Sequence, residues 1–264
     1  MKAMNVAVIM YHGFSPKAIK KPSLSVVAAE LKHQLFFLKD CGYTSVTSPE
    51  QFDQVDKPVM ITFDDALFSV FDIALPIMND LGFQGVVFLP AAVISDTLPY
   101  NCGIDYAESD RFMTVDELQT LLMNGWTIES HAYSHQKLTE LTFDQVREEF
   151  TLSRNLILEK LNFDSKMIAY PYGSYNRFIL EIAEKAGFNY GFSVHQGLVK
   201  SLSSEMRLPR LEIDNETDLN TFKYMLNTGF KTKKDAFIGK IKNYLFKSPY
   251  IKDVLQSVLP NKIN

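Results

Sequence analysis

Short apolar segments alternate with longer amphipathic segments along most of the chain. The apolar segments are rich in Val, Ile, Phe and Tyr, which is typical of buried β-strands. The segments between them repeat apolar residues at the period of an α-helix. This alternation predicts an α/β fold in which βα units form a parallel sheet or barrel. The predicted strands cover residues 5–11, 59–63, 85–90, 126–129, 167–170 and 190–194, and the predicted helices cover residues 26–40, 68–81, 117–124, 146–161 and 177–187.

Several predicted helices begin at residues that can cap them. Thr114 with Glu117 and Thr142 with Gln145 both match the capping-box pattern, in which each side chain bonds to the other residue's backbone N–H. Ser23 could cap the first helix in the same way, through its hydroxyl oxygen. These residues predict where three of the helices start.

Polar residues stand at the carboxyl ends of several predicted strands, in the stretches MYH, TFDD, IESH and AYPYG. In a βα barrel the active site gathers at the carboxyl ends of the strands. We therefore expect His12, Asp64, Asp65, His131 and Tyr172 to lie close together.

Composition limits the class of protein. With 264 residues, 46% of them hydrophobic and 22% charged, the chain can form one large domain or two modest ones with a sizeable core. The formal net charge of -4 gives no reason to expect nucleic acid as a partner. Cys41 and Cys102 are too few for a disulfide framework and lack CxxC spacing, which favours reduced thiols. The apolar run at residues 6–10 is too short for a signal peptide, so we expect a cytoplasmic protein.

The C-terminal residues differ in charge from the rest of the chain. Residues 231–264 hold eight lysines and two aspartates, which gives a formal charge of +6. Apolar residues recur between the lysines at helical spacing. One interpretation is a helix docked on the domain, and the other is a peripheral contact with anionic lipid. We accordingly divide the chain into a catalytic domain at residues 1–230 and a basic amphipathic tail at residues 231–264.

The pair Asp64 and Asp65 follows an apolar strand, where burial of a charge is costly unless the charge is paired or bound to a metal. His131 and His135 would share one face if residues 131–135 formed a helical turn. Two imidazoles and one carboxylate could hold a catalytic metal with open positions. If the strand continues through both aspartates, their side chains point apart, and the second carboxylate could act as a general base. A plain acidic turn and two structural histidines are the alternatives.

The segment YPYGSYN at residues 170–176 is rich in turn-forming residues. A backbone N–H in this turn could stabilise a developing oxyanion. An ordinary loop between a strand and a helix explains the same residues equally well.

The motifs TFDDA, SHAYSH and AYPYG, in that order, resemble the first three motifs of the polysaccharide deacetylases, which form carbohydrate esterase family 4 and contain the NodB homology domain. The resemblance covers roughly residues 5–215. It implies a distorted (β/α) barrel, a divalent metal, and hydrolysis of N-acetyl or sometimes O-acetyl groups on amino sugars.

The resemblance also implies roles for residues of each motif. Asp64 corresponds to the catalytic base, and Asp65 corresponds to a metal ligand. His131 and His135 correspond to the other two ligands. Tyr172 corresponds to the residue whose backbone N–H helps to form the oxyanion hole.

The chain departs from the family pattern at two places. Ala169 stands where the third motif usually has an Arg, and the usual Leu-x-His motif near the C-terminus is absent. However, the N-terminal IMYHGF is similar to the circularly permuted branch of the family, the poly-N-acetylglucosamine deacetylases of biofilm synthesis. That similarity makes His12 the candidate general acid. Arg210, in LPRLEI, could replace the missing Arg and orient Asp64, or it could form a structural salt bridge.

Two other histidines have no assigned role. His195 lies near a predicted strand end and can be neither placed in the site nor excluded from it, and His33 falls in the first helix, where a structural or exposed position is expected.

Together these observations predict a metal-dependent hydrolase that removes an N-acetyl group from an amino sugar. The alternatives are a non-catalytic carbohydrate-binding relative and a deacylase for another acyl group such as formyl. The expected substrate is an N-acetylated sugar in polymeric, nucleotide-linked or lipid-linked form, and a lipid-linked sugar at the inner membrane face suits the basic tail best. Zinc is the default metal, with cobalt, nickel, manganese and iron as alternatives.

Overall fold

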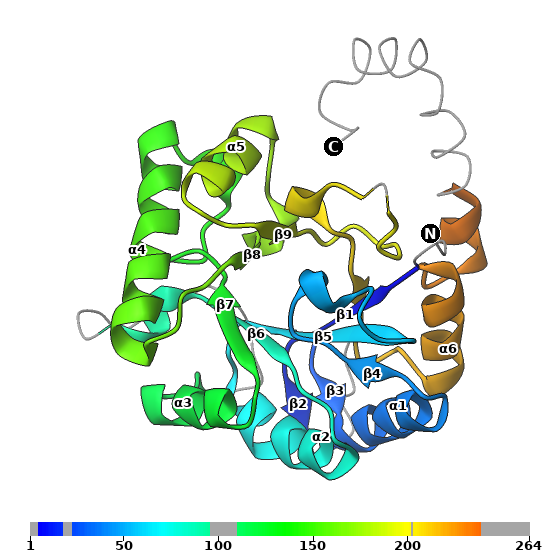
Figure 1. Cartoon of the computed structure of the whole chain (residues 1–264). Coiled ribbons are helices and arrows are strands. Elements are labelled where there is room, and N and C mark those ends of the chain that lie inside the picture. The colour runs from blue at the N-terminus through cyan, green and yellow to red at the C-terminus, as the bar shows by residue number, and fades with distance from the viewer. Residues whose placement is uncertain (1–4, 18–22, 96–109, 202, 239–264) are drawn as a thin grey trace, which may run out of the picture.

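The computed structural model describes residues 5–17, 23–95, 110–201 and 203–238. Its centre is a curled eight-stranded sheet with the order β10-β1-β5-β6-β7-β8-β9, in which β4 also pairs with β5 (Figure 1). The paired strands of this sheet run parallel, as the alternation of strands and helices predicts. The strands are β1 (Ala7–Tyr11), β4 (Thr44–Ser45), β5 (Pro58–Asp64), β6 (Val86–Leu89), β7 (Thr127–Ser130), β8 (Met167–Ala169), β9 (Tyr190–Phe192) and β10 (Leu211–Glu212).

Helices surround the outer face of this sheet (Figure 1). A π-helical stretch at Val70–Ala74 leads directly into α2, so the helix predicted over residues 68–81 is confirmed. The fold is therefore the distorted (β/α) barrel that the sequence predicts. The helices are α1 (Ala28–Asp40), α2 (Leu75–Leu81), α3 (Val115–Met123), α4 (Phe143–Leu161), α5 (Arg177–Lys185) and α6 (Leu219–Thr228).

One short segment, residues 208–212, joins the two ends of the sheet. Leu208 forms a parallel bridge with Phe192 of β9, and three residues later Leu211 pairs with Ile9 of β1. The segment contains β10, one terminal strand of the curled sheet, and its bridge at Leu208 reaches β9, the other terminal strand. Arg210 lies in the middle of this segment, a place from which its side chain can enter the barrel.

Successive residues of a strand face opposite sides of the sheet, and β5 shows this alternation clearly. Ile61 packs in the large cluster between sheet and helices, whereas Met60 packs in a separate cluster inside the barrel. Thr62 and Asp64 share the parity of Met60 and therefore face the interior. The strand thus delivers a carboxylate to the inside of the barrel at its carboxyl end.

Two of the three predicted helix starts are confirmed, because Thr114 begins α3 and Thr142 begins α4, each with a complete capping box. The prediction for Ser23 is wrong. Val27 caps α1 without a side-chain hydrogen bond, and the hydroxyl of Ser23 accepts a hydrogen bond from Ser25 N instead. The reason is a small second sheet, in which β2 (Phe14–Ser15) pairs with β3 (Val26–Val27) and delays the start of the helix.

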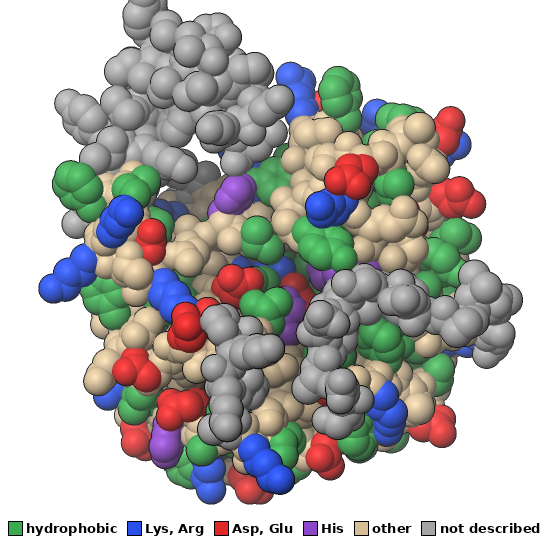
Figure 2. Space-filling view, turned by 180° about the vertical axis from the view of Figure 1, so that it is seen from behind, with side chains coloured by type: hydrophobic (Ala, Val, Ile, Leu, Met, Phe, Trp, Pro, Cys, Tyr) green, Lys and Arg blue, Asp and Glu red, His purple; other side chains and the backbone are tan. Residues whose placement is uncertain are grey.

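The predictions for the cysteines and for the C-terminal tail can be compared with the structure only where these residues are described. Cys41 is a free thiol, and Cys102 lies outside the described residues, as do residues 239–264 of the tail. Within the described ranges, none of the helices combines the length and the apolar character that a membrane crossing needs. On the face in Figure 2, the coloured Lys and Arg side chains are interspersed with acidic and hydrophobic ones.

We expect Thr142→Ala to lower the free energy of unfolding by about 1 kcal/mol, because the first turn of α4 loses its side-chain cap. Urea unfolding would measure this change. Thr151→Ala is the matched control, since Thr151 is exposed inside the same helix and bonds only back to Arg147 O in its own helix. An equal loss in both variants would contradict the capping role.

Candidate active site

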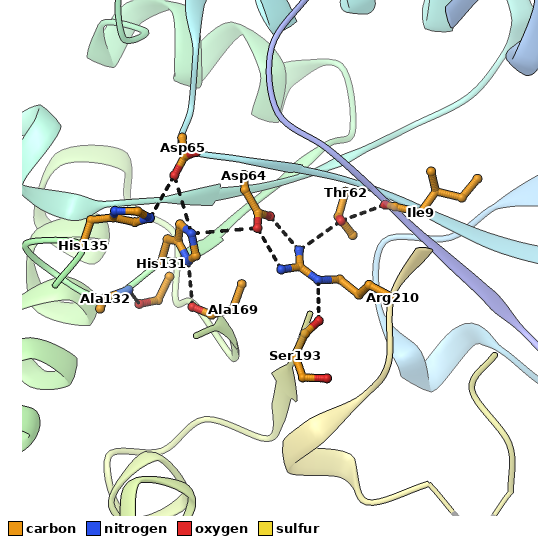
Figure 3. A network of polar contacts seen from close by, with 11 residues as sticks. Ile9, Thr62, Asp64, Asp65, His131, Ala132, His135, Ala169, Ser193 and Arg210 are labelled. Atoms are coloured by element: carbon orange, nitrogen blue, oxygen red, sulfur yellow. Dashed lines mark hydrogen bonds and ion pairs between the residues drawn. The ribbon is translucent and has the colours of Figure 1, made fainter. Parts of the chain in front are cut away.

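Asp64, the last residue of β5, forms a buried ion pair with Arg210 across the barrel interior (Figure 3). Arg210 Nη1 donates to Asp64 Oδ1 at 2.6 Å, and Nη2 donates to Oδ2 at 2.8 Å. Asp64 is 2% exposed and Arg210 is fully buried. Two parallel charge-assisted bonds fix the plane of the carboxylate as well as its position.

The rest of the Arg210 guanidinium is also bound. Nε donates to Ser193 O at 3.1 Å, and Nη1 reaches Thr62 Oγ1 at 3.3 Å. The guanidinium lies over the Phe88 ring, with 5.4 Å between the guanidinium carbon and the ring centroid. These contacts anchor Arg210, so Asp64 is held by a rigid partner.

Asp65 turns to a different set of partners. Its Oδ1 lies 3.2 Å from His135 Nε2 and 3.5 Å from His131 Nε2, and all three residues are buried. The nearer oxygen of Asp64 is 3.8 Å from His131 Nε2, so the two carboxylates flank this imidazole (Figure 3). The two carboxylates share the neighbour His131 but differ in their main partners, Arg210 for Asp64 and His135 for Asp65, so their side chains do point apart.

The backbone reason for this divergence differs from the one predicted. The strand ends at Asp64, and Asp65 has a φ of 73°, so a left-handed residue rather than a continuing strand redirects the second carboxylate. Residues 131–135 likewise form no helical turn. Ala132 and His135 have φ values of 60° and 56°, and this irregular loop brings the two histidine rings to a centroid distance of 4.7 Å.

Burial and neighbouring charges set the protonation states. Burial would raise the pKa of Asp64, but the Arg210 guanidinium lowers it below its ordinary value. Burial would also raise the pKa of Asp65, yet the adjacent His135 and His131 lower it. Burial lowers the pKa of His131 to about 4. Both carboxylates are thus ionised and His131 is neutral near pH 7, which are the forms that accept a proton or bind a metal.

The side chains of Asp65, His131 and His135 fit a divalent metal ion. One ligand atom from each of the three lies within 4.8 Å of the other two. Asp65 Oδ1 is buried and has no aligned hydrogen bond among the described residues, although two ring nitrogens face it. A charged oxygen left in this state is costly unless a cation binds it. One carboxylate and two imidazoles are a typical catalytic ligand set.

The tautomer of His131 also fits metal binding. Its Nδ1 lies 2.7 Å from Ala169 O, a distance at which the ring donates a hydrogen bond to the carbonyl. The proton on Nδ1 leaves Nε2 with its lone pair directed at Asp65 and His135. The sequence did not predict this role for Ala169, which stood out only because the family usually has an Arg at that position. Any residue type has a backbone carbonyl, so the contact has no signal in the sequence.

His12 directly follows β1 and is 9% exposed. It lies close enough to the aspartate pair that a charge on its ring would lower the pKa of both carboxyl groups. Its Nδ1 is buried and has no hydrogen-bond partner within the described part of the chain. The structure thus places His12 beside Asp64 and Asp65, as expected for a residue at a strand end.

Tyr172 lies in the turn Pro171–Gly173, one residue beyond the end of β8, and has a φ of 57°. The residue is 48% exposed, and its ring stands beside that of His135, with ring centroids 4.7 Å apart. The strand-end prediction therefore places five polar residues together correctly.

The remaining two histidines are exposed, unlike His12, His131 and His135. His195 is exposed and packs against Tyr175, while its backbone oxygen accepts a hydrogen bond from Arg210 N. The side chain of His33 is 62% exposed and lies 3.8 Å from Glu30, so it has the surface position expected for it.

The barrel and the three motifs at its strand ends agree with the resemblance to the polysaccharide deacetylases that the sequence shows. The family model described as "Polysaccharide deacetylase" matches residues 52–191, which is more than half of the chain, and the chain belongs to this family. It is therefore a hydrolytic deacetylase of the polysaccharide type.

Individual relatives agree with this assignment. The chain is 26% identical over 219 residues to YxkH of Bacillus subtilis (strain 168), a protein assigned to the polysaccharide deacetylases, covering 80% of this chain and 72% of that one. It is 24% identical over 222 residues to a poly-beta-1,6-N-acetyl-D-glucosamine N-deacetylase of Staphylococcus aureus (strain MSSA476), covering 78% and 73%. The solved structure of the Streptococcus pyogenes deacetylase PplD in complex with acetate superposes with a TM-score of 0.74 at 21% identity, covering 87% of this chain and 100% of that one. The last likeness concerns the fold.

We expect Arg210→Leu to lower the free energy of unfolding by about 3–5 kcal/mol, because it leaves the buried Asp64 carboxylate without its partner. Urea unfolding would measure the loss. In the double variant Asp64→Asn/Arg210→Leu the uncompensated charge is gone, so part of the stability should return. A loss below about 1 kcal/mol in the single variant would show that the ion pair is not coupled to folding.

Proposed function

We propose that this chain removes the N-acetyl group from an N-acetylated amino sugar by metal-dependent hydrolysis. The observation that carries the proposal is the opposite pairing of two adjacent buried carboxylates. Asp64 faces a cation, Arg210, whereas Asp65 faces two imidazole nitrogens. Such a division suits one carboxylate for proton transfer and the other for metal binding.

Asp65, His131 and His135 would hold the metal. A divalent ion bound there would polarise the acetyl carbonyl and make water a better nucleophile at neutral pH. Zinc suits this ligand set, and cobalt, nickel, manganese or iron could also occupy it.

Asp64 would act as the general base. The Arg210 guanidinium keeps its carboxylate ionised and fixes its orientation, and Asp64 Oδ2 lies beside the ligand His131. A carboxylate held in this way can take the proton from the attacking water without having to reorient first.

His12 and Tyr172 would complete the chemistry on the substrate. His12 lies next to both aspartates in a buried position, from which a protonated ring can donate to the departing amine. The backbone N–H of Tyr172, in the turn beside His135, would donate a hydrogen bond to the developing oxyanion.

The relatives support an N-acetylglucosamine-containing glycan as the first substrate to test, since one of them is named for that polymer. Nucleotide-linked and lipid-linked sugars, as cytoplasmic or inner-membrane-face precursors, are the other forms that the proposal includes. A binding role without catalysis is less well supported, because the base candidate and all three ligand candidates are retained in one buried cluster.

We expect the zinc-loaded protein to release acetate from N-acetylglucosamine oligomers, and a chelator to abolish that release. Asp64→Asn should lower kcat about 10²–10⁴-fold while the folded protein still binds zinc, because the proton acceptor is lost and the three ligand candidates remain. The variant also leaves Arg210 without its ion-pair partner, so urea unfolding of the same sample is needed to separate lost stability from lost catalysis. Acetate release and zinc content would be measured on the same samples.

His12→Gln offers a complementary comparison. Loss of a general acid should slow amide hydrolysis much more than hydrolysis of an aryl acetate, whose leaving group departs without a proton. Equal losses on both substrates would contradict the role of His12. No acetate from any sugar, despite bound zinc, would favour another acyl group or a binding role.

We also propose that the basic tail at residues 231–264 contacts an anionic membrane surface. Residues 233–238 are helical, with Phe237 65% exposed and Ile238 40% exposed beside the exposed Lys233 and Lys234. The start of the tail is tied to the domain, because Lys231 Nζ pairs with Asp214 at 2.5 Å. A tethered basic segment with exposed apolar residues suits a membrane surface.

Each lysine near an anionic surface contributes about 1 kcal/mol to binding, which is about fivefold in affinity. The double variant Lys233→Gln/Lys234→Gln should therefore weaken binding to phosphatidylserine-containing vesicles by about fivefold for each of the two lysines. Sedimentation with vesicles would measure this. Lys185→Gln/Lys200→Gln is the matched control, since both residues are exposed outside the tail. Unchanged binding after deletion of residues 231–264 would refute the membrane proposal.

A further inference from the structure

The loop between the two histidine ligand candidates has a strained backbone. Ala132 and His135 both adopt left-handed φ values, of 60° and 56°. This conformation costs a non-glycine residue about 1–2 kcal/mol and persists only where surrounding contacts hold it. Some other part of the chain must therefore hold this loop.

Glu149 of α4 makes three contacts to the middle of that loop. Its Oε2 accepts hydrogen bonds from Tyr133 N at 3.0 Å and from Ser134 N at 2.8 Å, and its Oε1 accepts one from Ser134 Oγ at 2.5 Å. Glu149 is 8% exposed, although its neighbour Glu148 is exposed. All three of these hydrogen bonds to the nearly buried carboxylate come from Tyr133 and Ser134, so Glu149 binds this one short segment specifically.

The helix that carries Glu149 is itself firmly placed. Val146 and Phe150 on the same face are buried in the core, and Ser153 Oγ lies 2.7 Å from Ser130 Oγ. Ser130 Oγ in turn accepts a hydrogen bond from Ala132 N at 3.1 Å. Ser153 thus supports the His131 end of the loop, and Glu149 supports the His135 end.

We propose that Glu149 is a positioning residue for the metal site. Its carboxylate fixes the Tyr133–Ser134 backbone and thereby sets His135 Nε2 at the right distance from Asp65 and His131. The inference rests on the proposed function in one respect, because it takes these three residues as the metal ligands. Glu149 acts through the loop and makes no contact with the metal or the substrate.

The chemistry of the contact explains why a carboxylate suits this position. Two backbone N–H groups and one hydroxyl converge on it, and an ionised carboxyl accepts at both oxygens. A glutamine can still accept from both N–H groups through its one carbonyl oxygen and can donate to the hydroxyl oxygen. A leucine of similar size offers none of these bonds and leaves two N–H groups unsatisfied.

The first test compares zinc affinity in the full-length chain, by competition with a chromophoric chelator. Loss of an outer-shell partner typically weakens metal binding about 10–100-fold, and we expect Glu149→Leu to fall in this range. Glu149→Gln should recover most of the affinity. Glu148→Leu, one residue away on the same helix, should bind zinc as the wild type does.

A second readout does not depend on the metal. We expect the backbone amides of Tyr133 and Ser134 to exchange hydrogen faster in Glu149→Leu than in the wild type, both with and without zinc. Ser134→Ala removes only the hydroxyl contact, and it is the fallback if Glu149→Leu does not fold: it should weaken zinc binding in the wild-type background, and unchanged binding there would count against the positioning role. If Glu149→Leu folds, Ser134→Ala should have a smaller effect in that background, because the two side chains share one contact.

The outcomes separate this inference from the proposed function. If Glu149→Leu folds, binds zinc as tightly as the wild type and shows unchanged exchange at both amides, the positioning role is overturned while the zinc site stands. If the wild type binds no zinc, the proposed metal site fails, and amide exchange alone decides whether Glu149 holds the loop.

Discussion

Two carboxylates at adjacent positions have to stay ionised in the interior of a barrel. The surrounding residues supply the groups that compensate these two buried charges. Asp64 is compensated by Arg210 through two hydrogen bonds, and Asp65 faces two imidazole nitrogens, a group of three residues that could hold a metal ion. Neither arrangement can replace the other, because an unpaired buried charge would shift its pKa or destabilise the fold. The change of backbone direction at Asp65, where β5 stops, is what lets neighbouring residues meet such different partners.

Closure of the sheet and compensation of the charge are achieved by the same five residues. Residues 208–212 bond to β9 at one end and to β1 at the other, and Arg210 enters the barrel between these two contacts. Arg210 and Asp64 are 146 positions apart in the sequence, so their pairing belongs to the same long-range contacts that close the sheet.

The sequence predicted the parts of this structure that depend on local pattern. Strand and helix periods gave the βα order, and the polar residues at strand ends gave the cluster around Asp64 and His131. The pairing of Arg210 with Asp64 could be considered only as one of two alternatives, because a contact across 146 residues has no local signature. The supports from Ala169 O and Glu149 were missed for different reasons. A carbonyl is invisible in residue type, whereas Glu149 could have been found, since it falls on the buried face of α4.

Left-handed backbone conformations gather around the site. Of the six described non-glycine residues with positive φ, five lie at the carboxyl edge of the sheet: Asp65, Ala66, Ala132, His135 and Tyr172. At about 1–2 kcal/mol each, they store conformational strain in loops that the helices and strands must keep in place. On warming, these loops should relax first, because relaxation releases their conformational strain energy. The catalytic edge should therefore lose its geometry before the barrel melts, so that heat inactivation precedes global unfolding and a bound metal ion delays it.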